Sequence, residues 1–208
     1  FESKSGRQAV LAKVVIDSTG DGDLFPYAGI ECETDIPPHF RIANLALCFW
    51  VDGVDLEKVN EFRKNNPKEA MDLMRKAMES GAWGGFMPSN LPNQESIVWF
   101  HNRYPNKSQI DVEELTRVEF EGRERAINTL DFFRENYPGF EKSFIVLTSP
   151  QLGTRSSRRM VGEYWLTEKD LADNQPFIDT IAIFPDLDRG RDSLEHPNMY
   201  IPYRALLP

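Results

Sequence analysis

One stretch of this sequence decides its fold: Val14-Val15-Ile16-Asp17-Ser18-Thr19-Gly20-Asp21-Gly22-Asp23. Its three consecutive β-branched residues predict a strand covered on both faces, and open α/β sheets bind ligands just beyond the carboxyl ends of such strands. Gly20 and Gly22 lack the Cβ that keeps a ligand at a distance, and either can adopt a positive φ. The stretch therefore predicts a buried strand, a turn that contacts a ligand, and a short helix after the turn.

The residues around this stretch predict where the first domain lies. Residues 1–11 have the pattern of a hairpin with its turn at Ser5-Gly6-Arg7, and residues 8–16 form its returning strand. After residue 30 the composition becomes polar, and Pro37-Pro38 excludes a helix. We place the crossing into a second domain there.

The second domain is predicted to mix strands and helices. Residues 42–51 are apolar and indicate a central strand. Asp55 and Asn66 begin two helices, and Asp111 with Glu114 begins a long helix over residues 111–136. Further strands are predicted at 97–100, 144–147, 160–166 and 180–184. The fold class is therefore α/β, with an α+β second domain.

Two predictions concern packing within these helices. The long helix is expected to carry Val112, Leu115, Val118, Ile127, Leu130 and Phe133 inward. The methionines of residues 71–87 recur at helical spacing, so we interpret them as core residues rather than as a soft-metal or promiscuous binding surface. Trp83, Trp99 and Trp165 are interpreted as packing residues with one edge in water.

Composition and charge exclude several functions. The net charge of -9 argues against a nucleic-acid partner, because phosphate binding needs clustered positive charge. No apolar run approaches the roughly 18 residues of a membrane helix, so no membrane partner is expected. Cys32 and Cys48 lack C-x-x-C or histidine spacing, which argues against a metal site. We expect a cytoplasmic protein that binds a small molecule.

The acidic turn allows three interpretations from its residues alone. It can approach a cofactor through its main chain, or it can be a simple Asx-stabilised turn, which D-G pairs often form. Asp17, Thr19 and Asp21 also match the first ligand positions of an EF-hand loop. In that interpretation Ala28 stands where a bidentate glutamate is needed, which disfavours calcium.

Three segments together resemble the FAD-dependent oxidoreductases of the glutathione-reductase-like superfamily: residues 12–23, 152–164 and 200–208. Their order and spacing agree with that family, although Ser18 replaces the usual alanine of the first motif. The resemblance implies that FAD is the cofactor. The residues it implies for cofactor binding are Thr19, Gly20, Asp21, Gly22, Asp23, Gly153 and Arg204.

The resemblance also implies an activity, the exchange of a hydride between flavin and a small organic substrate. Arg155 and Arg158 are candidate catalytic residues, because guanidinium forks bind carboxylates and can stabilise an anionic reduced flavin. An acid is therefore the expected substrate. His196 is the candidate proton donor. The alternative is a non-enzymatic module that binds an anionic ligand through the arginine cluster of residues 153–159.

The resemblance finally implies a division of the chain. Residues 1–36 belong to an FAD-binding domain, 37–198 to a substrate domain, and 199–208 re-enter the FAD-binding domain. The sequence contains no G-x-G-x-x-G, the turn with which such flavoproteins hold the pyrophosphate. We therefore expect an internal part of a longer flavoprotein, with the remainder as its partner, that alone is inactive and binds FAD weakly or not at all.

Overall fold

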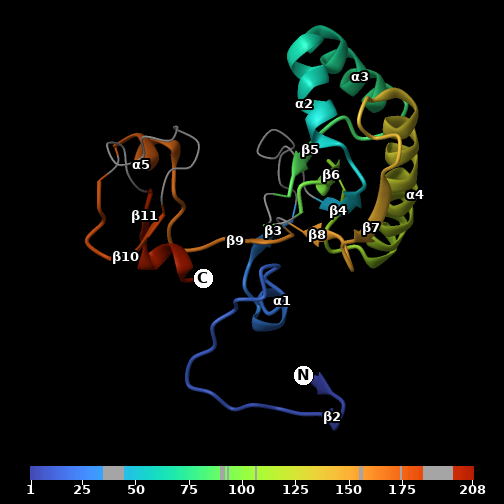
Figure 1. The fold of residues 1–208 in the computed structure, drawn as a ribbon. Helices are drawn as coiled ribbons and strands as arrows, with labels where there is room; N and C mark the ends of the chain where they lie inside the picture. Colours follow the sequence, from blue (N-terminus) through green and yellow to red (C-terminus); the bar gives the residue numbers. More distant parts are fainter. Residues whose placement is uncertain are drawn as a thin grey trace. The chain divides into compact units, whose positions relative to one another are not determined.

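The computed structural model describes residues 1–34, 45–89, 92, 94–105, 107–154, 157–173, 175–184 and 199–208. The chain forms two compact units (Figure 1). Unit 1 contains residues 1–35 and 158–208, and unit 2 contains residues 36–157. Both units combine helices with antiparallel sheets, which confirms the predicted α/β class.

The centre of unit 2 is an antiparallel sheet with the strand order β5-β6-β4-β7, and β8 also pairs with β4. The strands are β4 (Leu45–Asp52), β5 (Phe86–Pro88), β6 (Val98–Tyr104), β7 (Phe144–Thr148) and β8 (Gly153–Thr154). In the register of β4 and β6, Phe49 lies opposite Phe100. The predicted central strand is confirmed as β4, and the short strand predicted at 97–100 is the longer β6.

Helix α4 (Val112–Asn136) packs on this sheet, and α3 (Pro67–Glu79) contacts both α4 and α2 (Leu56–Asn65) (Figure 1). The odd-numbered residues of β4 from Leu45 to Val51 are buried in the core, as alternation along a half-covered strand requires. They pack in two clusters that contain Val118, Ala126, Leu130 and Phe133 of α4. No helix among the described residues is long and apolar enough to cross a membrane.

The packing of α4 departs from its prediction at two positions. Val118, Leu130 and Phe133 are buried as predicted, whereas Val112 and Ile127 are exposed. Val112 is the first residue of the helix. Ile127 follows the buried Ala126 and therefore lies about 100° further round the helix. The inward prediction is wrong for these two residues.

The methionines of α3 are also placed differently from the prediction. Ala70 and Ala77 are the buried residues of this helix, whereas Met71 is 72% exposed and Met78 is exposed as well. Each of these methionines follows a buried alanine by one position and so turns away from the core. The core interpretation is wrong for Met71 and Met78, and also for Met87, which lies in strand β5 and is exposed. Met74 packs against the core.

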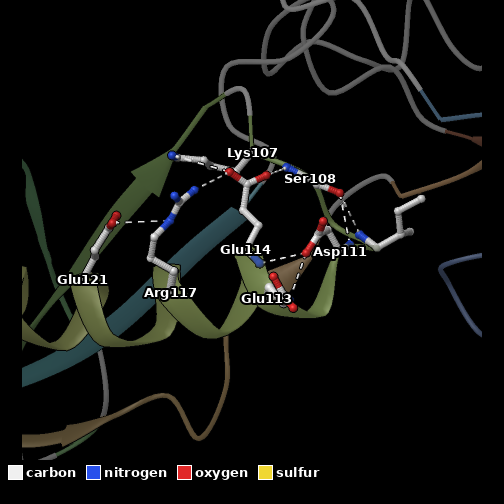
Figure 2. Close-up of polar contacts among 8 residues, drawn as sticks. Lys107, Ser108, Asp111, Glu113, Glu114, Arg117 and Glu121 are labelled. Atoms are coloured by element: carbon white, nitrogen blue, oxygen red, sulfur yellow. Dashed lines mark hydrogen bonds and ion pairs between the residues drawn. The ribbon is translucent and has the colours of Figure 1, made fainter.

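The start of α4 shows how local sequence begins a helix (Figure 2). The Asp111 carboxylate accepts hydrogen bonds from the amides of Glu113 and Glu114, both at 2.9 Å. Glu114 in turn accepts from the Ser108 amide at 2.6 Å and from Arg117 Nη2 at 2.8 Å. The predicted Asp111 cap is confirmed, because its carboxylate satisfies amides that the first turn leaves unpaired. The predicted role of Glu114 is not, because the Asp111 amide donates to Ser108 Oγ at 3.1 Å and Glu114 accepts from the Ser108 amide instead.

We expect the Asp111→Ala substitution to lower the free energy of unfolding of unit 2 by about 1 kcal/mol, the usual value of an N-cap. Asp111→Ser is the matched control, because a serine hydroxyl can still accept from the first-turn amides. Urea titration followed by circular dichroism measures both. Equal losses for alanine and serine would show that capping is not the cause.

Unit 1 is built from short elements. Strands β1 (Glu2–Ser3) and β2 (Gly6–Arg7) form a hairpin as predicted, but its turn is Lys4-Ser5, so Gly6 and Arg7 lie in a strand and not in the turn. Helix α1 (Phe25–Ala28) is the predicted short helix. Strand β3 (Cys32–Glu33) pairs with β9 (Arg159–Met160), and β10 (Thr180–Phe184) pairs with β11 (Met199–Pro202). The unit also contains α5 (Glu168–Asp173) and the 3₁₀ helix η2 (Tyr203–Leu206).

The buried strand predicted at residues 8–16 is not formed. No strand is assigned to these residues, and Val10, Val14, Val15 and Ile16 are exposed, as is Leu11 at 99%. A strand needs a partner for its backbone groups, and the described residues supply none here. The strand predicted at 160–166 is likewise limited to β9, which ends at Met160.

The compact units divide the chain differently from the predicted domains at one boundary. The first boundary lies near residue 36 in both divisions. Residues 158–198 were assigned to the substrate domain, whereas the compact division groups them with unit 1. The reason is that β9 pairs with β3 and β10 pairs with β11. The functional assignment of the domains stays a prediction.

Candidate functional site

The turn at residues 17–23 is closed by its own side chains. Asp17 Oδ1 accepts from the Thr19 amide at 2.9 Å and from Thr19 Oγ1 at 2.7 Å. Asp17 Oδ2 accepts from the Leu24 amide at 2.9 Å. Thr19 Oγ1 also accepts from the Asp23 amide at 3.1 Å. Asp17 and Thr19 therefore hold both ends of the turn, and its shape does not depend on a ligand.

The hydrogen bonds to Asp17 change its ionisation. The Thr19 amide and then the Thr19 hydroxyl lower the pKa of the Asp17 carboxyl below its ordinary value of 3.8, because both bonds favour the charged form. The stabilisation from these bonds is therefore complete at neutral pH. It is lost as the pH falls through the lowered pKa, so the turn keeps its ionised acceptor throughout the physiological range.

The two glycines of the turn have different surroundings. Gly20 has a φ of +85° and Gly22 a φ of +61°, which are conformations that favour glycine. A Cβ added at Gly22 would lie 2.6 Å from the Phe25 ring, so Gly22 is needed for packing. A Cβ added at Gly20 would have no described atom within 4 Å. Gly20 is therefore the position where another molecule can approach the main chain.

Arg158 lies on this turn. Its Nη1 donates to the Asp21 carbonyl oxygen at 3.1 Å and to Asp23 Oδ1 at 2.9 Å. The Arg158 side chain is 19% exposed. Two predicted site segments that are far apart in the sequence, the acidic turn and the arginine cluster, are thus joined by one guanidinium. No pattern in the sequence predicts that Arg158 binds the turn itself.

The residue after Arg158 is fixed independently. Arg159 pairs with Glu33 across β3 and β9, and its guanidinium lies 4.5 Å from the centroid of the Trp165 ring. The Val161 amide donates to the Glu31 carbonyl at 2.9 Å. The backbone pairing of β9 with β3 and the Val161 bond attach the chain on the C-terminal side of Arg158 to residues 31–33, so the backbone that carries Arg158 is held within unit 1 without the Arg159 side chain.

Arg204, a predicted cofactor residue, lies in another cluster of unit 1. Its Nη1 pairs with Asp179 at 2.9 Å, and its guanidinium lies 4.4 Å from the Tyr164 ring and 5.2 Å from the Phe177 ring. The Tyr164 hydroxyl donates to Asp170, and this bond is the main cause that raises the pKa of Tyr164. A cofactor role for Arg204 stays a prediction.

The remaining predicted site residues are Gly153, Arg155 and His196. Gly153 lies in β8 of unit 2, opposite Ala46 of β4. Arg155 and His196 lie outside the described residues. The roles predicted for these three residues are therefore unchanged by the structure.

The face of the unit 2 sheet away from the helices carries side chains that the sequence did not mark as functional. Trp50 lies opposite Trp99, and Cys48 opposite His101, with all four side chains half-buried. The rings of Trp99 and His101 have centroids 5.9 Å apart. These side chains alternate with the buried residues of β4 and β6, so they lie on the face of the sheet opposite the core.

Fold and turn together define a class of protein: a two-unit α/β protein whose acidic, glycine-containing turn leads into a short helix. Within that class, the chain belongs to the FAD dependent oxidoreductase family, because the family model matches residues 1–208. No curated protein and no solved structure matches the chain significantly. The predicted family and its FAD dependence are confirmed, whereas membership of the glutathione-reductase-like superfamily stays a prediction.

The turn fits this cofactor. Gly20 offers its main chain without a side chain in front of it, and the turn is preformed by Asp17 and Thr19. Backbone amides in such turns, with αL glycines, form concavities that suit the polar groups of nucleotides. Thr19, Gly20 and Asp21 are thus able to contact FAD, while Gly22 and Asp23 maintain the shape of the turn.

Proposed function

We propose that this chain takes part in the exchange of a hydride between FAD and a small organic acid, with the turn at residues 17–23 as its contact with FAD. The observation that carries the proposal is the accessible main chain at Gly20 within a turn that is already closed. Family membership supports the redox chemistry, which FAD supplies when it is bound.

The residues of the chain would bind and orient rather than react. No covalent nucleophile is needed for hydride exchange, and the protein supplies position, charge and exclusion of water. Main-chain groups from Thr19 to Asp21 would contact the cofactor. Arg155 is retained as the candidate that binds a substrate carboxylate, because a planar guanidinium binds a carboxylate through two parallel hydrogen bonds.

The exposed residues 10–16 support a further part of the proposal. Side chains such as Leu11 and Ile16 are too apolar to favour full exposure as a group, so we propose that additional polypeptide of the flavoprotein covers them as a neighbouring strand. In that arrangement the apolar segment becomes the buried strand that the sequence predicts, and it leads directly into the FAD-contacting turn.

We expect the flavoprotein that contains this chain to bind FAD, and its flavin absorbance to bleach when a small organic acid is added without oxygen. Absence of bound flavin would refute the proposal, and bound flavin that no organic acid bleaches would refute the substrate class.

A further inference from the structure

We propose that Arg158 is a positioning residue that locks the FAD-contacting turn, rather than a catalytic residue. This inference rests on the proposed contact between the turn and FAD. It replaces the role predicted for Arg158 from the sequence, in which the guanidinium binds substrate or stabilises reduced flavin. The contacts of Arg158 within unit 1 carry the inference, in three steps.

The first step is geometric. Arg158 Nη1 binds the main-chain oxygen of Asp21 and the side-chain oxygen of Asp23, so its two acceptors lie on either side of Gly22. Glycine has the widest choice of backbone conformations, and a turn with two glycines gains most from an external constraint. The described sequence-local bonds of the turn join Asp17 and Thr19 to the amides of Thr19, Asp23 and Leu24, and Arg158 adds a bond to the Asp21 carbonyl from outside the turn.

The second step is electrostatic. Asp17, Asp21 and Asp23 place three carboxyl groups within seven residues, and FAD brings a negatively charged pyrophosphate. Like charges at short range repel, whereas the ion pair of Arg158 with Asp23 offsets one of these charges. The Thr19 amide and hydroxyl are the main causes that lower the pKa of Asp17, and the positive charge of Arg158 acts in the same direction.

The third step concerns the anchoring of Arg158 itself. A residue can position another group only if its own backbone is held, and the pairing of β9 with β3 begins at the next residue. Both bonds to the turn come from the single nitrogen Nη1. Among the described contacts, neither Nη2 nor Nε of the Arg158 guanidinium donates a hydrogen bond to the turn. Arg158 therefore connects the turn to the β3–β9 pair.

The experiment compares Arg158→Gln, Arg158→Lys and the control Arg159→Gln in the flavoprotein that contains this chain. Hydrogen exchange of the Asp23 and Leu24 amides in the apoprotein reports the closed turn without FAD, because these amides donate within it. The dissociation constant for FAD is measured separately by flavin fluorescence. Arg159→Gln removes a neighbouring ion pair, with Glu33, that does not contact the turn.

We expect Arg158→Gln to speed exchange of these two amides and to raise the FAD dissociation constant, each by about tenfold, while unit 2 amides stay unchanged. Arg158→Lys should restore part of the slow amide exchange and part of the FAD affinity, since a lysine keeps the charge but not the planar fork. Arg159→Gln should leave the exchange rates and the FAD dissociation constant near those of the unmodified protein.

Unchanged exchange in Arg158→Gln would overturn the inference, as would equal effects of Arg158→Gln and Arg159→Gln. Faster exchange with unchanged FAD binding would also overturn it. In that case the Gly20→Ala variant described below distinguishes the cause. If Gly20→Ala weakens FAD binding, the proposed FAD contact stands and only the role of Arg158 is wrong. If Gly20→Ala has no effect, the proposed contact itself is wrong.

Discussion

Replacing Phe133 with alanine will lower the free energy of unfolding of unit 2 by about 3–5 kcal/mol, the usual cost of removing a buried phenylalanine. Phe133 lies on α4 and is fully buried. Its ring centroid lies 5.1 Å from that of Phe100 in the sheet, 5.0 Å from Phe140 and 5.3 Å from Tyr137. The loss therefore combines apolar area, aromatic contacts and a cavity that rigid neighbours cannot fill.

Phe120→Ala is the matched control for this experiment, because Phe120 belongs to the same helix and is 74% exposed. We expect it to change the free energy of unfolding by less than about 0.5 kcal/mol. Both variants are measured by urea denaturation, followed by tryptophan fluorescence and by circular dichroism. Similar losses for the two variants would show that helix propensity, rather than core packing, determines the result.

The aromatic core illustrates which part of the fold the sequence predicts. Phe133 was predicted to face inward because it repeats at helical spacing with Leu130 and Val118 along a long helix. Phe86 and Phe140 pack against the Phe133 ring. Phe86 lies in a three-residue strand, and Phe140 lies in the chain after α4. Short segments carry no periodicity, so their burial is decided by tertiary contacts that one sequence does not show.

The acidic turn and the segment before it show the same contrast. The turn forms as predicted because Asp17 and Thr19 satisfy nearby backbone groups, so its shape needs only local residues. Residues 8–16 do not form the predicted strand, because strand pairing depends on a distant partner. The same reasoning explains why the bond between Arg158 and the turn was not predicted, since it joins residues over 130 positions apart.

In the flavoprotein that contains this chain, replacing Gly20 with alanine will raise the dissociation constant for FAD about a hundredfold. Gly22→Ala will mainly distort the conformation of the turn. The Gly20 Cβ would enter the space through which the proposed cofactor approaches the main chain, and no described atom occupies it. At Gly22 the added methyl would instead meet the Phe25 ring at 2.6 Å. Fluorescence titration with FAD measures the dissociation constant of each variant.

The control for Gly20→Ala must carry the same backbone strain without lying at the turn. Gly81 meets this requirement, because its φ is also +85° and no described atom lies within 4 Å of a Cβ added there. A left-handed alanine costs about 1–2 kcal/mol at either position, so both variants should lose similar stability. If Gly81→Ala weakens FAD binding as much as Gly20→Ala, strain alone explains the effect. Only a loss confined to Gly20 indicates that FAD contacts the main chain at this turn.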